Sequence, residues 1–298
     1  MAKAKASAKT AKARIGGVTD KDGWRPLRIL VSNDDGIHAP GLKAAEKVAR
    51  ALSDDVWIIA PETEQSGASH SLTLTRPLRV RKIGPKKFAV DGTPTDCVMM
   101  GVLHIMKDFR PDLVISGVNR GSNIADDVTY SGTIAAAMEG TVLGIPSIAL
   151  SQAYTFDKNV QVRWSCAEAY GPTVIRKLLA AGWPKEVLVN INFPDRAPDK
   201  VEGVRVTEQG KRDQATLMVD ERIDARGNPY FWIGFKRILS NPPQGTDLRA
   251  IYDGFVSVTP LHLNLTETPT IKMFESVLGT PPKKPRKGKA QPKAIEVG

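Results

Sequence analysis

Short apolar runs rich in β-branched residues alternate with segments of helical periodicity through most of this 298-residue chain. A run bounded by polar residues predicts a buried strand, and apolar residues at every third or fourth position predict a helix. Their alternation is typical of an α/β, Rossmann-like fold, an open, mostly parallel sheet with helices on both faces. We expect strands at 28–32, 55–60, 73–83, 87–90, 112–116, 146–150 and 187–192, and helices at 40–52, 94–106, 133–143 and 164–179.

The pattern changes beyond residue 198. Runs at 201–208, 215–220 and 230–235 are separated by polar and Gly/Pro-rich segments, which predicts β-hairpins, and 267–278 has the pattern of a short helix. We therefore expect an α/β domain over 27–198 and a smaller C-terminal β-hairpin region over 199–280.

The formal net charge of +10 is concentrated at the two ends of the chain. Residues 1–26 hold seven Lys or Arg against two Asp, residues 281–298 hold six Lys or Arg against one Glu, and the body between them is neutral. Both ends are rich in Ala, Lys and Pro, so we expect disordered basic extensions with at most weak, non-specific polyanion binding. The neutral body argues against a dedicated nucleic-acid surface.

The sequence also indicates a cellular setting. The N-terminal Lys/Ala run lacks the apolar core of a secretory signal, and no stretch approaches the roughly 20 apolar residues that span a membrane. Cys97 and Cys166 follow no metal-ligand spacing, and the four histidines are not paired along a predicted helix. We expect a soluble, cytoplasmic protein with structural thiols and without a zinc site.

The first predicted strand ends in two adjacent carboxylates, Asp34 and Asp35, within the run Leu30-Val-Ser-Asn-Asp-Asp-Gly. Neighbouring carboxylates repel each other, so a fold that presents both at a strand end commonly holds a cation there. An Asn-Asp-Gly turn without a metal fits the same residues equally well.

Two later loops rich in oxygen donors, 61–70 and 117–133, also follow predicted strands. Ligands of open parallel sheets bind at the carboxyl ends of the strands, so three such loops at one edge favour a metal site. Ser131, Gly132 and Thr133 open a predicted helix whose first N–H groups suit a phosphate, and Asn123 could add an amide donor. Ser131 is equally suited to be a simple N-cap.

The chain resembles the SurE family of 5'-nucleotidases in four segments: SNDDGIHAPGL, APETEQSGASHSLTL, DGTPTDCV and PDLVISGVNRGSNIADDVTYSGTIAAAMEGTVLGIPSIALS. The likeness runs from about residue 28 to 266 and includes VNINFP, QGKRD, GTD and SVTPL. The chain differs at Asn264, where family members commonly have aspartate, and its two basic ends lie outside the resemblance.

The resemblance implies a divalent-metal phosphomonoesterase that hydrolyses nucleoside 5'-monophosphates to nucleoside and phosphate. It assigns one divalent ion per subunit to Asp34, Asp35, Ser66 and Asn119, whose hard oxygen donors favour Mg²⁺ or Mn²⁺. The sequence has no D-x-D-x-T segment and no paired histidines for a phosphoenzyme. We therefore expect a metal-activated water as the nucleophile, oriented or deprotonated by Asp34 or Asp35.

The resemblance also makes residues 27–198 a catalytic domain and residues 199–280 an oligomerisation region. It implies a homodimer or homotetramer with exchanged C-terminal elements. The expected phosphate ligands are Asn123, Ser131, Gly132 and Thr133.

Other interpretations stay open at this stage. The same site could act mainly on 3'-nucleotides or short polyphosphate, and a protein of a different class could bind polyanions through the basic tails. Asp126 and Asp127 fit a solvated turn or a subunit contact, and Arg120 fits phosphate binding, an interface ion pair or an ordinary surface position.

Overall fold

The computed structural model describes residues 18–20, 23–155, 161–212, 217–235 and 241–279. By their contacts, residues 1–263 form one unit and residues 264–298 a second. The expected extension at 281–298 and most of that at 1–26 lie outside the described residues. Within 1–26, β1 (Val18–Asp20) and β2 (Gly23–Arg25) pair as a short antiparallel ladder.

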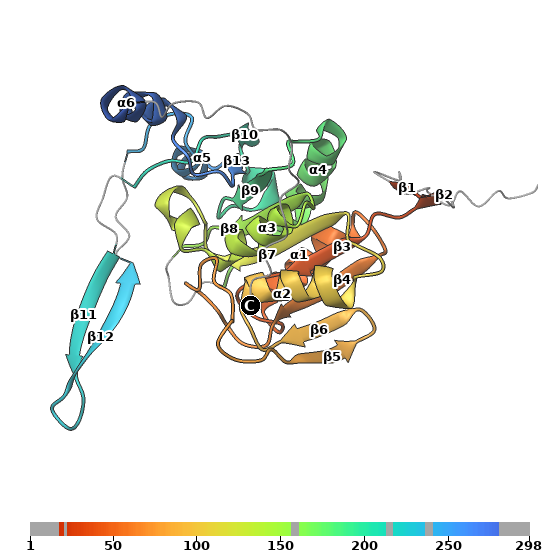
Figure 1. Cartoon of the computed structure of the whole chain (residues 1–298), viewed down its shortest axis with the longest axis horizontal. Helices are drawn as coiled ribbons and strands as arrows, with labels where there is room; N and C mark the ends of the chain where they lie inside the picture. Colours follow the sequence, from red (N-terminus) through yellow and green to blue (C-terminus); the bar gives the residue numbers. More distant parts are fainter. Residues whose placement is uncertain (1–17, 21–22, 156–160, 213–216, 236–240, 280–298) are drawn as a thin grey trace, which may run out of the picture. The chain divides into compact units, whose positions relative to one another are not determined.

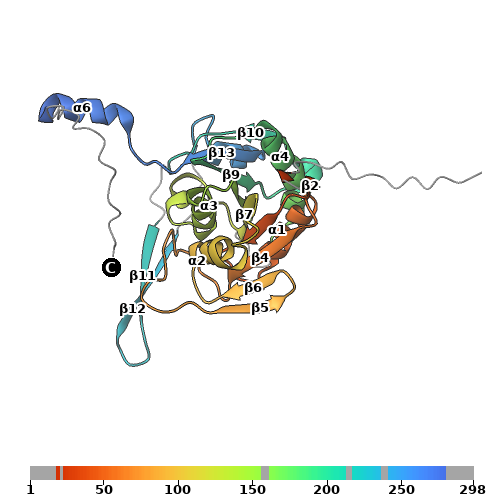
Figure 2. The same ribbon diagram turned by 45° about the vertical axis from the view of Figure 1, so that its right-hand side comes forward.

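Within the described residues, the first unit is built on a nine-stranded sheet in the order β10-β13-β9-β8-β7-β3-β4-β6-β5 (Figure 1). In Figure 2, β5 and β6 lie at the bottom of this sheet and β13 and β10 at its top. Its neighbouring strands are parallel, apart from β13 with β9 and β5 with β6. The expected open, mostly parallel sheet is confirmed. The strands are β3 (Ile29–Ser32), β4 (Val56–Pro61), β5 (Val80–Gly84), β6 (Lys87–Val90), β7 (Leu113–Arg120), β8 (Ser147–Gln152), β9 (Val187–Phe193), β10 (Val204–Val206) and β13 (Val256–His262).

Helices cover both faces of the sheet, as the alternation predicted. One core cluster joins the strands to α1 (Pro40–Arg50) and α4 (Ser165–Ala181), and another joins them to α2 (Pro94–Met100) and α3 (Gly132–Val142). The buried residues of α1 recur at helical spacing, so this helix presents one apolar face to the strands. Among the described helices, none has the length and apolar composition needed to cross a membrane.

Two expected elements are shorter than predicted. The strand expected at 73–83 is confined to β5, because Thr73 bonds the Asp96 carboxylate through both its backbone N–H and its hydroxyl, at 3.1 and 2.6 Å. Pro77 also lacks the N–H that a ladder requires. The helix expected at 94–106 changes after α2 into the π-helix η1 (Gly101–Ile105), at the point where Gly101 packs directly on Leu30 and Ile59.

The C-terminal part differs more from expectation. The run at 201–208 was predicted as part of a hairpin, but its strand β10 pairs in parallel with β13, so it belongs to the main sheet. Only β11 (Leu217–Ile223) and β12 (Pro229–Phe235) form a hairpin among the described residues of this part. The helix α5 (Asp247–Asp253) and strand β13 were not predicted.

In the second unit, α6 (Thr268–Leu278) matches the expected short helix. The remaining short elements are the 3-10 turns η2 (Ala125–Thr129) and η3 (Pro198–Lys200).

Candidate active site

A pocket opens at the carboxyl ends of the central strands. In the sheet, β4 lies on one side of β3 and β7 on the other. At such a reversal of strand order, a crevice opens between the loops that follow β3 and β7. Residues from the loops after β3, β4, β7 and β10 line the pocket: Asp34, Ser66, Gly67, Asn119, Arg120, Gly121, Ser122, Asn123, Asp127, Tyr130, Ser131 and Arg212.

Asp34 lies at the end of the buried strand β3 and is only 4% exposed. Its Oδ1 accepts a hydrogen bond of 2.5 Å from the Thr133 hydroxyl at the start of α3. Gly132 packs so closely that a Cβ there would lie 2.8 Å from the Asp34 Cβ, so the helix start and the carboxylate are fitted to each other. Burial raises the pKa of Asp34 to about 7, against a lowering by the Thr133 bond.

Asp35 is half-buried and does not line the pocket. Its Oδ2 accepts a long hydrogen bond of 3.3 Å from the backbone N–H of Arg120, which ties the loop after β3 to the end of β7. Burial raises the pKa of Asp35; the Arg120 bond opposes that rise and the nearby Glu64 carboxylate adds to it. The two neighbouring carboxylates therefore both favour a proton or another positive charge.

Ser66 comes from the loop after β4 and Asn119 from the end of β7. The Gln65 N–H donates to the Asp34 carbonyl at 2.8 Å and so anchors the Ser66 loop beside Asp34. The Ser66 hydroxyl donates to Glu64 at 2.9 Å, which leaves its oxygen lone pairs available. The Asn119 amide donates through Nδ2 to the Gly121 carbonyl at 2.9 Å, so its Oδ1 remains as an acceptor.

This donor set fits a hard divalent cation. Asp34, Ser66 and Asn119 share one pocket, Asp35 adjoins it, and together they offer two carboxylates, a hydroxyl and an amide oxygen. Among the described residues, neither Asp34 nor Asp35 forms an ion pair with Lys or Arg. Oxygen ligands with uncompensated negative charge suit Mg²⁺ or Mn²⁺. Among the described residues, no three His, Cys, Asp or Glu side chains are grouped so that they could hold a metal ion.

The expected phosphate ligands divide into two groups. Ser131 and Asn123 line the pocket. Ser131 is also the N-cap of α3, with its hydroxyl accepting from the Ile134 N–H at 3.1 Å, so the capping interpretation holds. The Asn123 side chain donates to Ser151 at 2.9 Å. Gly132 and the Thr133 hydroxyl face Asp34 and do not line the pocket, so only their backbone N–H groups remain candidates for a phosphate.

Sequence reasoning missed part of the pocket wall. Arg212, Asp127 and Tyr130 line it, although Asp127 had been expected in a solvated turn or subunit contact. Asp127 instead binds the Arg212 guanidinium through both carboxylate oxygens. The only signal in the sequence was the QGKRD segment containing Arg212, which marked a resemblance without indicating a role.

The chain matches known proteins over nearly their whole length. The sequence profile of the family described as survival protein SurE matches residues 29–216. The chain belongs to the SurE family. It is 65% identical over 269 residues to the 5'-nucleotidase SurE of Parvibaculum lavamentivorans, covering 89% of this chain and 97% of that protein. It is 61% identical over 248 residues to the 5'-nucleotidase SurE of Methylorubrum extorquens, covering 83% of this chain and 98% of that protein.

A solved SurE structure matches the fold as well. The crystal structure of the SurE protein from Aquifex aeolicus superposes with a TM-score of 0.74 at 39% sequence identity, covering 84% of this chain and 99% of that one. The four expected metal ligands of this chain and all residues that line the pocket lie within residues 29–216, the range that the family profile matches.

Proposed function

We propose that this SurE protein hydrolyses nucleoside 5'-monophosphates to nucleoside and phosphate, in the pocket at the carboxyl ends of β3, β4 and β7. The observation that carries the proposal is the meeting of Asp34, Ser66 and Asn119 in one pocket, with Asp35 beside it and the N-terminus of α3 on its wall. The relatives that bear the name 5'-nucleotidase SurE are 58–65% identical to the chain, which supports the same reaction here.

One divalent ion per subunit, Mg²⁺ or Mn²⁺, would be held by Asp34, Asp35, Ser66 and Asn119. When bound, such an ion supplies positive charge against the phosphoryl oxygens and lowers the pKa of water. The fit rests on the donor set: the raised pKa of Asp34, caused mainly by burial, means that this carboxylate is poorly compensated without a cation.

The chain's own residues then divide the remaining work. Thr133 holds the Asp34 carboxylate in one orientation through its short hydrogen bond, and Asp34 faces the pocket whereas Asp35 is turned toward Arg120. Asp34 is therefore the carboxylate we assign to orient the attacking water. The first N–H groups of α3 and the Ser131 hydroxyl stand at the positive end of a helix, where they bind the phosphate oxygens.

We also propose that the protein forms a homodimer or homotetramer through its C-terminal region. The hairpin strand β12 exposes Phe231, Trp232 and Ile233, and α6 has no buried residue while exposing Met273, Phe274 and Leu278. Several large apolar side chains exposed on one element favour an interaction site on that element. A second copy of the chain is the occupant that fits the implied exchange of C-terminal elements.

The thiols agree with a cytoplasmic location, which we propose for the protein. Cys97 and Cys166 are free and buried. Burial raises the pKa of Cys166 to about 12, so its thiol is unreactive. Buried, unreactive thiols suit a reducing compartment.

A hydrolysis panel tests the substrate. Steady-state rates are measured on 5'-nucleotides, 3'-nucleotides and short polyphosphate, each with Mg²⁺, Mn²⁺ and Zn²⁺. We expect the highest kcat/KM on 5'-monophosphates with Mg²⁺ or Mn²⁺, and loss of activity in Asp34→Asn and Asp35→Asn proteins that remain folded. Asp199→Asn is the matched control, because Asp199 is an exposed acid outside the pocket.

Two results would contradict the proposal. A preference for 3'-nucleotides or polyphosphate would overturn the substrate while keeping the site. Activity of Asp34→Asn within about threefold of the parent at saturating metal would overturn the site itself, because loss of a catalytic ligand costs far more.

A further inference from the structure

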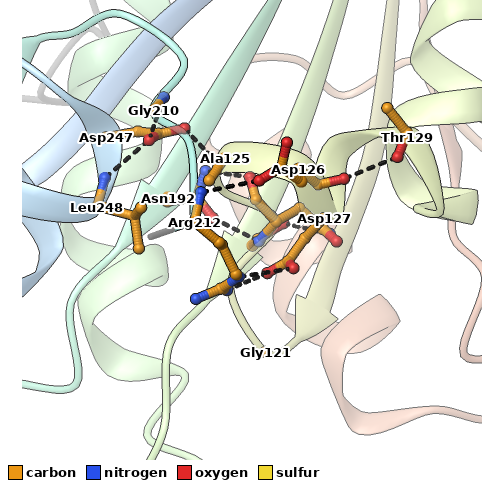
Figure 3. Close-up of polar contacts among 12 residues, drawn as sticks. Gly121, Ala125, Asp126, Asp127, Thr129, Asn192, Gly210, Arg212, Asp247 and Leu248 are labelled. Carbon is orange, nitrogen blue, oxygen red and sulfur yellow. Dashed lines mark hydrogen bonds and ion pairs between the residues drawn. The ribbon is translucent and has the colours of Figure 1, made fainter. Parts of the chain in front are cut away.

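The pocket is completed by a segment from beyond the central strands. After β10 the chain turns back, and the Gln209 side chain donates to the Ala125 carbonyl at 3.0 Å. The fully buried Asp247 carboxylate joins the same two segments, because it accepts from the Ala125 N–H at 2.9 Å and from the Gly210 N–H at 2.8 Å (Figure 3). These bonds fix the position of the next residues of the segment against η2.

Arg212 is the residue of this segment that reaches the pocket. Its Nε donates to Asp127 Oδ1 at 3.0 Å, its Nη2 donates to Asp127 Oδ2, and its backbone N–H donates to Asp126 at 2.8 Å (Figure 3). The Arg212 and Asp127 side chains are 13% and 18% exposed. Both line the pocket together with Asp34 and Ser131. The guanidinium is thus held in one orientation at the pocket wall.

Stability alone gives no reason for this ion pair. A largely buried pair gains little net free energy, because the cost of removing two charges from water offsets their attraction. Asp127 engages one edge of the guanidinium, and Nη1 has no hydrogen-bond partner among the described residues. A guanidinium has five N–H donors and is well suited to phosphate, so the donors that Asp127 leaves unused can bind an anion.

The anion that fits is a phosphate. Arg212, Asp127 and Ser131, the N-cap of α3, line the same pocket, so the guanidinium bound to Asp127 and the N-terminus of α3 border one space. Of the arginines that line the pocket, Arg120 is exposed and stacks over the Tyr154 ring at 5.2 Å, whereas Arg212 is fixed. A nucleoside carries no charge, whereas the phosphate of a monoester carries up to two negative charges.

We propose that Arg212 is a phosphate-binding residue of the active site, contacting the substrate through the guanidinium edge that Asp127 leaves free, with Asp127 as its positioning residue. The assignment rests on the proposed phosphomonoesterase function and adds a recognition element to it. It also gives the segment after β10 a role in substrate binding.

Direct phosphate binding tests the assignment separately from turnover. Inorganic phosphate is titrated calorimetrically into the metal-loaded full-length parent and the variants Arg212→Gln, Arg212→Lys, Asp127→Asn and Arg205→Gln. KM is measured for adenosine 5'-monophosphate and for p-nitrophenyl phosphate, which has no nucleoside. Arg205 is the control, because it pairs with Asp253 at 3.0 Å but does not line the pocket.

We expect Arg212→Gln to weaken phosphate binding and to raise KM for both esters by roughly ten- to a hundredfold, the worth of a charged hydrogen bond. Asp127→Asn and Arg212→Lys should each weaken phosphate binding at least fivefold. Arg205→Gln should match the parent, and metal affinity should be unchanged in all variants.

Three results would overturn the assignment: phosphate affinity of Arg212→Gln within threefold of the parent, a rise in KM for the nucleotide alone, or parent-like affinity in Arg212→Lys. The last comparison decides the matter if thermal melting shows that Arg212→Gln is not folded. A parent that binds phosphate through Arg212 but does not hydrolyse the nucleotide would refute the nucleotide substrate and support this assignment.

Discussion

At the scale of single residues, Asp34 combines burial with the absence of a cationic partner among the described residues, and this makes its charge costly to the fold. Its pKa is raised to about 7, from an ordinary value of 3.8. The folded protein therefore binds this proton more tightly than the unfolded chain does. Between about pH 4 and 7, stability of the metal-free protein is lost as pH rises, by up to about 4 kcal/mol for a shift of this size.

The first prediction follows from this loss of stability with rising pH. Asp34→Asn cannot ionise, so the metal-free variant should gain stability relative to the metal-free parent on going from pH 5 to pH 8. Urea unfolding at both pH values measures the difference. Asp55→Asn is the opposite control. Burial raises the pKa of Asp55, but the hydrogen bonds from Lys86 and Arg28 outweigh that effect, so the pKa is lowered. Removing the Asp55 carboxylate should therefore destabilise the protein at pH 8. If the unfolding free energies of Asp34→Asn and the parent differ by the same amount at pH 5 and pH 8, the prediction is contradicted.

The second prediction separates two residues that line the same pocket. Ser131→Ala should weaken phosphate binding and cost roughly 1 kcal/mol as a lost N-cap, with metal affinity unchanged. Asn119→Ala should weaken metal affinity and be partly rescued by excess Mn²⁺ or Mg²⁺, because Asn119 Oδ1 is the atom that we assign to the cation, whereas its Nδ2 donates to Gly121. Calorimetric metal titrations of both variants measure this. Equal metal affinity would show that the two roles are assigned wrongly.

Individual site residues were predictable where their position relative to a strand end was readable. Asp34 follows a strand that the apolar runs revealed, whereas Ser66 and Asn119 were singled out by the resemblance to the SurE family. All three line one pocket. Arg212 was not predictable, because its partner Asp127 is 85 residues away and neither side chain follows a recognisable strand end. The Thr133 bond to Asp34 was hidden for the same reason, since a separation of 99 residues leaves no local pattern.

At the scale of elements, the start of α3 packs closely against the loop that follows β3 and carries Asp34, a residue of the pocket. The third prediction tests it with Gly132→Ala. The added Cβ would lie 2.8 Å from the Asp34 Cβ and 3.2 Å from Pro94, so Asp34 must shift, although alanine favours a helix over glycine. We expect at least a tenfold loss of kcat or of metal affinity in a protein that still folds.

Gly234→Ala serves as the control for this change, because its Cβ would meet only Met218 at an ordinary distance of 3.7 Å. Activity and metal titration are measured for both variants. Parent-like kinetics in Gly132→Ala would mean that α3 can move away from Asp34 without cost, and the close fit would then have no role in the reaction.

The elements were predictable where periodicity was strong and caps were clear, as in α1, which begins at Pro40, and α2, which begins with the Thr93–Asp96 capping box. The helix α5 was missed although Thr246 caps its start and Gly254, with φ +85°, ends it. With seven residues it shows too little periodicity to stand out. The strand β10 was misjudged because its pairing with β13 depends on a partner far along the chain.

At the scale of the whole molecule, the exposed apolar surface of β12 and α6 leads to the fourth prediction. Trp232→Ser combined with Phe274→Glu should shift the protein toward smaller species in sedimentation velocity, because both replaced side chains are more than half exposed in the single chain. Val142→Ser, an exposed apolar position on α3, is the control and should leave the distribution unchanged. An unaltered oligomer in the double variant would exclude these surfaces as the interface.

The last prediction concerns the two basic ends. They carry the whole net charge of +10, whereas every residue that lines the pocket lies between 34 and 212 and the family profile spans 29–216. Deleting residues 1–26 and 281–298 should therefore leave kcat and KM for a nucleoside monophosphate nearly unchanged.

The same deletion should abolish salt-sensitive binding to DNA or RNA, because such binding depends on the number of phosphates that Lys and Arg neutralise. Filter binding at several salt concentrations, together with steady-state kinetics, measures both effects. Loss of phosphatase activity in a folded, truncated protein would show instead that one of the ends contributes to the active site.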